Sequence, residues 1–156
     1  MMAKEIERKF LVSTDNWKDN VSATYVFRQG YLSYDSERTV RVRATEVNGY
    51  LTIKGITTGL TRDEFEYEIP LGDALSLLQM CERPAIEKKR YIVPHGAHTW
   101  EVDVFEGANA GLVVAEIELR SEDEVFESPT WLGEEVSGQR KYSNSALSLF
   151  PFKYWI

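Results

Sequence analysis

The sequence contains one cysteine, Cys81, among its 156 residues. A disulfide framework and a CxxC metal site each need at least two cysteines, so both are excluded. A chain of this length buries enough apolar surface to fold without disulfides. Cys81 lies in the apolar run "ALSLLQMCE", which is typical of a buried structural thiol. This cysteine usage favours a reducing, cytoplasmic location.

Long apolar runs are absent as well. No stretch approaches the roughly 20 consecutive apolar residues that a membrane-spanning helix needs. The first residues include charged side chains and do not form the apolar region of a signal peptide. We therefore expect a protein that is soluble, is not exported and has no membrane partner.

Basic residues are outnumbered, with 18 Lys and Arg against 25 Asp and Glu, and the net charge is −7. Such a chain repels a nucleic-acid backbone, so we expect no nucleic-acid partner. A small anionic ligand is still compatible, because the local arrangement of charge decides what a cleft attracts. Divalent metal ions can also reverse the sign of an acidic site.

Several catalytic signatures are also missing. The sequence has no P-loop, no dinucleotide-binding fingerprint and no evident Ser/His/Asp or Cys/His set. His95 and His98 lie in the turn "VPHGAH", where a solvated loop is favoured over a metal site. No internal repeat or linker is visible, so we expect a single domain over residues 1–156.

Alternating apolar and polar residues dominate the chain and predict eight strands. They are "KEIERKF", "YVFRQGYLSY", "RTVRVRAT", "GYLTIKGI", "RDEFEYEIPL", "EKKRYIV", "TWEVDVFEG" and "GLVVAEIELRS". Most connections are short, which favours antiparallel pairing. Helical periodicity is confined to residues 72–84, with Asp73 as N-cap, to 121–128, with a capping box at Ser121 and Glu124, and to 144–151. The predicted fold class is α+β.

One face of each predicted strand is charged, and neighbouring charges often have the same sign. Nine acidic residues share these faces with six basic ones: Glu5, Glu7, Glu64, Glu66, Glu68, Glu101, Asp103, Glu116 and Glu118, with Lys9, Arg41, Arg43, Lys54, Lys88 and Arg90. The opposite faces, including Ile53, Phe65 and Tyr67, are predicted to form a core. Alternation alone also fits a sheet with one solvated side. Uncharged polar residues are scarce on the charged faces, however, and like-charged neighbours are unfavourable unless something lies between them.

Eight strands are enough to close an antiparallel β-barrel. If the apolar faces point outward under a few short helices, the charged faces line a water-filled tunnel. Burying so many charges is costly unless each is paired or bound to a ligand. Carboxylates supply oxygen ligands for Mg²⁺ or Mn²⁺, and arginines supply paired donors for phosphate oxygens. The predicted lumen therefore suits a metal-bound polyphosphate.

The motifs along the chain resemble those of the CYTH domain, the triphosphate tunnel metalloenzyme superfamily. The opening "EIERKF" is similar to the family signature ExExK. Further matches follow in order: "RQGYL", "RVR", "TIKG", "RDEFEYEI", "EKKRY", "EVDVFEG", "AEIEL" and "WLGEEVSGQRKYSN". Together they extend from residue 5 to about residue 147. The resemblance implies an eight-stranded tunnel that binds a linear triphosphate together with a divalent metal ion.

The resemblance also implies roles for individual residues. The implied metal ligands are Glu5, Glu7, Glu116 and Glu118, with Asp103 and Glu66 as helpers. The implied phosphate ligands are Lys9, Arg41, Arg43, Lys54, Lys88 and Arg90, with Arg62 and Lys141 as outer candidates. Lys9, Lys88 and Tyr31 are the catalytic candidates. Whether Lys88 acts as a base is open. Tyr31 helps to close the tunnel mouth, orients water, or only packs within its strand.

Two positions depart from the family pattern. Lys141 stands where the family commonly has arginine, which leaves its phosphate role open. Ser137 stands where threonine is usual, and this exchange should matter little.

The expected activity is metal-dependent hydrolysis of a linear triphosphate, foremost inorganic tripolyphosphate, to pyrophosphate and phosphate by in-line attack of water. Thiamine triphosphate hydrolysis and cyclisation of ATP are alternatives in the same tunnel, although no residues for base recognition are evident. A non-catalytic polyphosphate-binding module is a further alternative, and the many carboxylates argue against it. The preferred metal and the oligomeric state, including a homodimer, stay open.

Overall fold

The computed structural model describes residues 3–155, which form nine strands and two α-helices. The strands are β1 (Lys4–Val12), β2 (Ala23–Ser33), β3 (Thr39–Ala44), β4 (Gly49–Lys54), β5 (Thr61–Ile69), β6 (Ile86–His95), β7 (His98–Phe105), β8 (Val113–Glu118) and β9 (Leu132–Glu135). The helices are α1 (Leu71–Met80) and α2 (Asn144–Leu149). Four 3₁₀ turns complete the set: η1 (Asn16–Asn20), η2 (Gly107–Asn109), η3 (Arg140–Tyr142) and η4 (Phe152–Tyr154).

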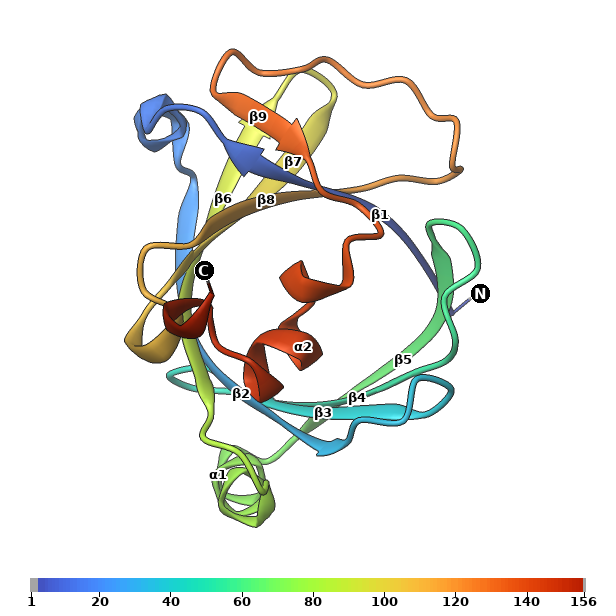
Figure 1. Cartoon of the computed structure of the whole chain (residues 1–156), viewed down its shortest axis with the longest axis vertical. Helices are drawn as coiled ribbons and strands as arrows, with labels where there is room; N and C mark the ends of the chain where they lie inside the picture. The colour runs from blue at the N-terminus through green and yellow to red at the C-terminus, as the bar shows by residue number, and fades with distance from the viewer. Residues whose placement is uncertain (1–2, 156) are drawn as a thin grey trace.

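Eight of the strands form a ring, in the order β5-β4-β3-β2-β6-β7-β8-β1, and the additional pairing of β5 with β1 closes it. Strand β1 makes this closure possible because its two halves have different partners. Lys4–Ile6 pair with β5, and Glu7–Leu11 pair with β8. Every pairing in the ring is antiparallel, and Figure 1 looks down its opening.

The ninth strand, β9, pairs with β1 outside the ring. The sequence did not predict it because "LGEE" is short and lacks alternating apolar residues. The eight predicted strands are all present within small boundary differences.

The apolar core lies mainly on the outer face of the ring. Trp100, Val102 and Ile117 project from β7 and β8 and are fully buried. They are covered by η1 and by the segment between β8 and β9, which supplies Trp131 and Phe126. On the opposite side of the ring, α1 packs on β2, β3 and β4. These covers protect the apolar faces from water, as the sequence pattern requires.

Part of the predicted outer core is exposed. Phe65 and Tyr67 of β5 are 44% and 56% exposed, and Ile53 of β4 is 36% exposed. Alternation identified the correct face of these strands, but α1 contacts β2, β3 and β4 and does not extend over the middle of β5. The core prediction is therefore wrong at these three positions.

Three helix predictions also need correction. Residues 121–128 are not helical, because Glu124 folds back to accept the backbone N–H of Arg120 and does not complete a capping box. Helix α1 begins after Pro70, which places Asp73 inside its first turn. Helix α2 exists at the predicted position, but it lies inside the ring and does not pack outside it (Figure 1).

An apolar cluster inside the ring holds α2 in place. Leu147 of α2 is fully buried against Tyr31, Ile86, Phe105 and Val114. These four side chains project inward from β2, β6, β7 and β8. One part of the ring interior is therefore filled by the C-terminal segment.

Candidate functional site

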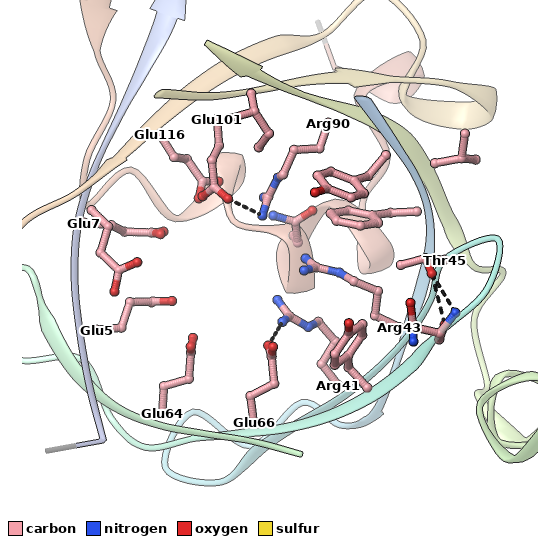
Figure 2. A pocket seen from close by; sticks show the side chains of 18 of the residues that line it. Glu5, Glu7, Arg41, Arg43, Thr45, Glu64, Glu66, Arg90, Glu101 and Glu116 are labelled. Carbon is pink, nitrogen blue, oxygen red and sulfur yellow. Dashed lines mark hydrogen bonds and ion pairs between the residues drawn. The ribbon is translucent and has the colours of Figure 1, made fainter. Parts of the chain in front are cut away.

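The rest of the ring interior is charged, and most of its acidic and basic side chains lie on different sides. Glu5 and Glu7 from β1, Glu64 from β5 and Glu116 from β8 occupy one side (Figure 2). The guanidinium groups of Arg41, Arg43 and Arg90 lie opposite, across open space. Strand alternation and ring closure together produce this arrangement, because residues two apart on each strand point to the same side of the sheet.

Two cavities of about 650 and 430 Å³ occupy this interior. They share five lining residues, namely Glu5, Glu7, Arg41, Lys54 and Asn144. Since the same side chains border both, the cavities are adjacent parts of one tunnel-like space. Its combined volume accommodates a small polyanion with its associated water.

The acidic side contains two close carboxyl pairs. Glu7 lies within hydrogen-bonding reach of Glu116, and Glu5 within reach of Glu64. Burial, with the carboxylates of Glu116 and Glu5, raises the pKa of Glu7 well above its ordinary value. Burial and the neighbouring Glu5 raise the pKa of Glu64 to about 7. Such shifts indicate negative charge that the protein itself does not fully neutralise.

Two lysines partly neutralise the negative charge of this acidic side. Lys54 Nζ lies 3.2 Å from carboxylate oxygens of both Glu5 and Glu64. Lys9 Nζ lies 3.6 Å from Glu116 Oε1. Burial alone would raise the pKa of Glu116, but Lys9 and nearby cations hold it well below its usual range. Glu7 forms no ion pair with any residue in the range 3–155 and is the least compensated member of the group.

The basic side contains one guanidinium, that of Arg43, with no ion-pair partner among residues 3–155, whereas Arg41 lies 3.4 Å from Glu66 and Arg90 lies 3.2 Å from Glu101. Arg43 lies over the Phe27 ring, with its Cζ 4.1 Å from the ring centroid, and its Nε donates to Gln29 Oε1 at 2.9 Å. Burial and the neighbouring Arg41 and Arg90 lower the pKa of Arg43 to about 9. The buried Nε of Arg41 has no hydrogen-bond acceptor within the described chain. An anion between Arg41 and Arg43 would favour the charged form of Arg43 and would supply an acceptor for Arg41 Nε.

A buried ion cluster connects Arg90 of the basic side to Asp103 and Lys88 behind it. Asp103 accepts from Arg90 Nε at 2.7 Å and from Lys88 Nζ at 2.7 Å. Lys88 also donates to Asn144 Oδ1 at 3.0 Å, and its exposure is 0%. Burial lowers the pKa of Lys88 to about 7, with Arg90 and Arg43 adding to the effect of burial and Asp103 opposing it. Both oxygens of Asp103 are thus occupied by cations, which favours a role in orienting Arg90 and Lys88 over a role as a metal ligand.

The carboxylates of the acidic side fit a divalent metal ion. Oxygen ligands are those that Mg²⁺ and Mn²⁺ prefer, and the two close carboxyl pairs each need a shared proton or cation. Within residues 3–155, no three acidic, histidine or cysteine side chains converge closely enough to hold a metal ion by themselves. Mg²⁺ commonly takes only one or two carboxylates and completes its coordination with water and substrate phosphates. The donor set therefore suits a metal ion that is bound together with a phosphate ligand.

Most of the predicted site residues border one or both cavities. These are Glu5, Glu7, Lys9, Tyr31, Arg41, Arg43, Lys54, Arg62, Glu66, Arg90, Glu116 and Glu118. Lys88 and Asp103 lie behind the cavity wall and are fully buried. Lys141 is exposed and lies over the Trp155 ring, with its Nζ 4.6 Å from the centroid. Its neighbour Arg140 borders the smaller cavity in its place.

Sequence reasoning missed several residues that border the cavities. Glu64 and Glu101 were counted among the charged faces but were given no role, although both project into the larger cavity. Asn144 begins the helix that was expected outside the ring, and Arg140 lies in the preceding turn η3. The arrangement of charged strands could have identified the first two residues. The motif "WLGEEVSGQRKYSN" contains the other two residues, but a motif alone does not show which of its side chains face the cavity.

A model of the CYTH domain matches residues 3–151. The chain belongs to the CYTH family. It is 50% identical over 153 residues to an inorganic triphosphatase of Acetivibrio thermocellus, and the match covers 97% of each chain. It is 37% identical over 150 residues to an inorganic triphosphatase of Nitrosomonas europaea, with 93% of this chain and 97% of the relative covered. The family resemblance predicted from the motifs is therefore confirmed.

A solved structure supports the same family relationship. The crystal structure of an inorganic triphosphatase superposes on this CYTH protein with a TM-score of 0.68 at 34% identity, covering 93% of this chain and 97% of the other. The charged ring interior is thus set in a fold that this triphosphatase shares. Among the described residues, no helix is long and apolar enough to cross a membrane.

Proposed function

We propose that this CYTH protein hydrolyses a linear triphosphate, most directly inorganic tripolyphosphate, to pyrophosphate and phosphate. The main support is the division of the ring interior, where carboxylates face arginines across a cavity of about 650 Å³. A triphosphate carries several negative charges along a narrow chain, so it can contact the arginines on one side. The carboxylates can then contact the ligand only through a metal ion or a proton. The names of the two relatives point to the same reaction.

The basic residues bind and orient the phosphate chain. Arg41, Arg43 and Arg90 present planar donors that match phosphate oxygens, and Lys54 and Lys9 add point charges at the border with the acidic side. Arg62 lines the smaller cavity and provides a further donor towards that end. These groups stabilise the charge that develops on the equatorial and leaving oxygens during in-line attack.

The acidic residues would hold Mg²⁺ or Mn²⁺. Glu5, Glu7, Glu116 and Glu118 border the larger cavity from β1 and β8, and Glu66 borders it from β5. The ion, when bound, would polarise the phosphate oxygens as a Lewis acid. In its absence Glu7 holds a proton more readily than an ordinary glutamate because of burial and its carboxylate neighbours.

Proton handling involves residues on both sides of the cavity wall. Lys88, with a pKa of about 7, can bind or release a proton at Nζ near neutral pH. Lys9 keeps Glu116 ionised through their ion pair. The buried Tyr31 borders the smaller cavity, where its hydroxyl can orient water. We propose that these steps take place in a tunnel that is open to water at both cavities.

A phosphate-release panel tests the proposal. Tripolyphosphate, ATP, thiamine triphosphate and pyrophosphate would each be supplied with Mg²⁺, with Mn²⁺ or with a chelator. We expect the fastest release from tripolyphosphate with metal and none with the chelator. ATP is an informative comparison because Tyr25, Phe27 and Tyr50 border the larger cavity and offer aromatic surface.

Three other outcomes would contradict the proposal. Binding of tripolyphosphate without turnover would indicate a binding module. Formation of cyclic AMP from ATP would indicate a cyclase. Preferred hydrolysis of thiamine triphosphate would assign a different physiological substrate.

A further inference from the structure

Asn144 is the first residue of α2, and its side chain borders both cavities. Its Oδ1 accepts two hydrogen bonds, from Lys88 Nζ at 3.0 Å and from Gln29 Nε2 at 3.2 Å. Asparagine amides can be placed in either of two orientations, so the identity of the atom that faces these donors must be argued from the surrounding network.

The hydrogen bonds that start at Arg43 determine the orientation of the Asn144 amide. Arg43 has only donors, so Gln29 must turn its Oε1 towards Arg43 Nε, at 2.9 Å. Gln29 therefore turns its amide nitrogen towards Asn144. A protonated Lys88 likewise has only donors. Both neighbours of Asn144 thus require its oxygen, and its nitrogen must point elsewhere.

The amide nitrogen of Asn144 has two protons, and no acceptor for them lies among residues 3–155. It is also not one of the fully enclosed polar atoms that lack a partner in the described chain. The nitrogen therefore faces the space that Asn144 borders, between the acidic and basic sides. We propose that Asn144 Nδ2 donates a hydrogen bond to a phosphate oxygen of the bound triphosphate, which makes Asn144 a ligand-binding residue. This inference rests on the proposed function.

Asn144 connects the buried Lys88 indirectly to the ligand, because Lys88 donates a hydrogen bond to the Asn144 carbonyl. Lys88 is 0% exposed and borders neither cavity, so it does not reach the ligand in this arrangement. Its ammonium group polarises the Asn144 carbonyl, and this polarisation strengthens the amide N–H groups as donors. Helix α2 thereby contributes a neutral donor to a site whose other phosphate contacts come from charged strand residues.

The variant Asn144→Asp tests the inference. Aspartate keeps an oxygen acceptor for Lys88 and Gln29 but replaces the amide donor with an anionic oxygen. We expect the Kd for tripolyphosphate, measured by calorimetry in chelator, to rise about tenfold or more. The KM of metal-activated hydrolysis should rise by a similar factor. The matched control is Asn16→Asp, which adds the same charge at an exposed position in η1, on the outside of the ring, and should change both constants less than twofold.

An unchanged Kd and KM in Asn144→Asp, or equal effects in the two variants, would overturn the inference. If Asn144→Asp does not fold, as judged by its thermal melt, Asn144→Ser provides the same comparison. Serine is well tolerated at the start of a helix and lacks the amide donor. Failure of the proposed function is separately recognisable, because the wild-type protein would then neither bind nor hydrolyse tripolyphosphate.

Discussion

At the scale of single residues, Glu7 shows how the site is incomplete without its ligands. Its carboxyl group lies close to Glu116 and forms no ion pair within the described chain. Most other charges of the interior have partners, such as Lys54 with Glu5 and Lys88 with Asp103. Glu7 is half-buried, and a carboxylate withdrawn from water without a partner lowers stability, a cost that a bound cation would remove.

The substitution Glu7→Gln is therefore expected to have opposite effects on activity and stability. Glutamine has the same shape and no charge, so metal-activated turnover of tripolyphosphate should fall by about 100-fold or more, because one metal ligand is lost. The melting temperature in chelator should stay the same or rise. Phosphate release and thermal melts measure the two effects. Glu37→Gln, at an exposed position, serves as the control and should change neither. Wild-type turnover in Glu7→Gln would remove Glu7 from the proposed metal site.

At the scale of elements, α2 has a structural role and a functional role at once. Leu147 fixes it in the ring through contacts with side chains from β2, β6, β7 and β8. The same helix presents Asn144 to the cavities. A six-residue helix is not stable alone, so its position depends on this burial.

The substitution Leu147→Ala should lower the free energy of unfolding by about 2–5 kcal/mol, because it opens a cavity in a fully buried cluster. For a chain of this size, the corresponding fall in melting temperature is roughly 5–15 °C. Leu149→Ala on the same helix is the matched control, since Leu149 is 43% exposed, and it should change stability by about 0.5 kcal/mol or less. Equal effects of the two variants in urea unfolding would show that α2 is not anchored inside the ring.

At the scale of the whole molecule, the concentration of carboxylates makes stability depend on pH. Burial raises the pKa of Glu7, Glu64, Glu101 and Glu118 above their unfolded values. The native state therefore binds more protons than the unfolded state between pH 4.5 and about 7, and stability falls as pH rises through this window. The lowered pKa values of Glu116 and Asp103 affect stability at pH values below this window. The lowered pKa of Lys88, about 7, affects stability at pH values above it.

In chelator, the melting temperature should thus be higher at pH 5.5 than at pH 7, by about 3 °C or more. Glu64→Gln should reduce this difference and stabilise the protein at pH 7, because Glu64 has a pKa of about 7. Saturating Mg²⁺ should reduce the difference as well, since the ion replaces the protons. Differential scanning calorimetry measures the melting temperature for the pH change, for Glu64→Gln and for saturating Mg²⁺. A melting temperature that rises steadily from pH 5.5 to 7 would contradict the assignment of these raised pKa values.

Much of the fold and site follows from local sequence patterns. Alternation along β1 placed Glu5, Glu7 and Lys9 on one face, and the structure puts all three at the cavities. The prediction failed at β9, whose four residues have no periodicity, and at residues 121–128, where Glu124 bonds to the backbone of Arg120. It also failed for Phe65 and Tyr67, since a pattern shows which face is apolar but not whether another element covers it.

The sequence by itself determined which side chains share a face and which charges are neighbours along each strand, because a strand has a fixed period of two. Only the tertiary structure decided that β1 joins β5 and β8, that the charged faces meet as an acidic and a basic side, and that α2 enters the ring. These outcomes depend on contacts between segments far apart in the chain. Lys88 and Asn144, 56 residues apart, meet only because the ring closes around the helix.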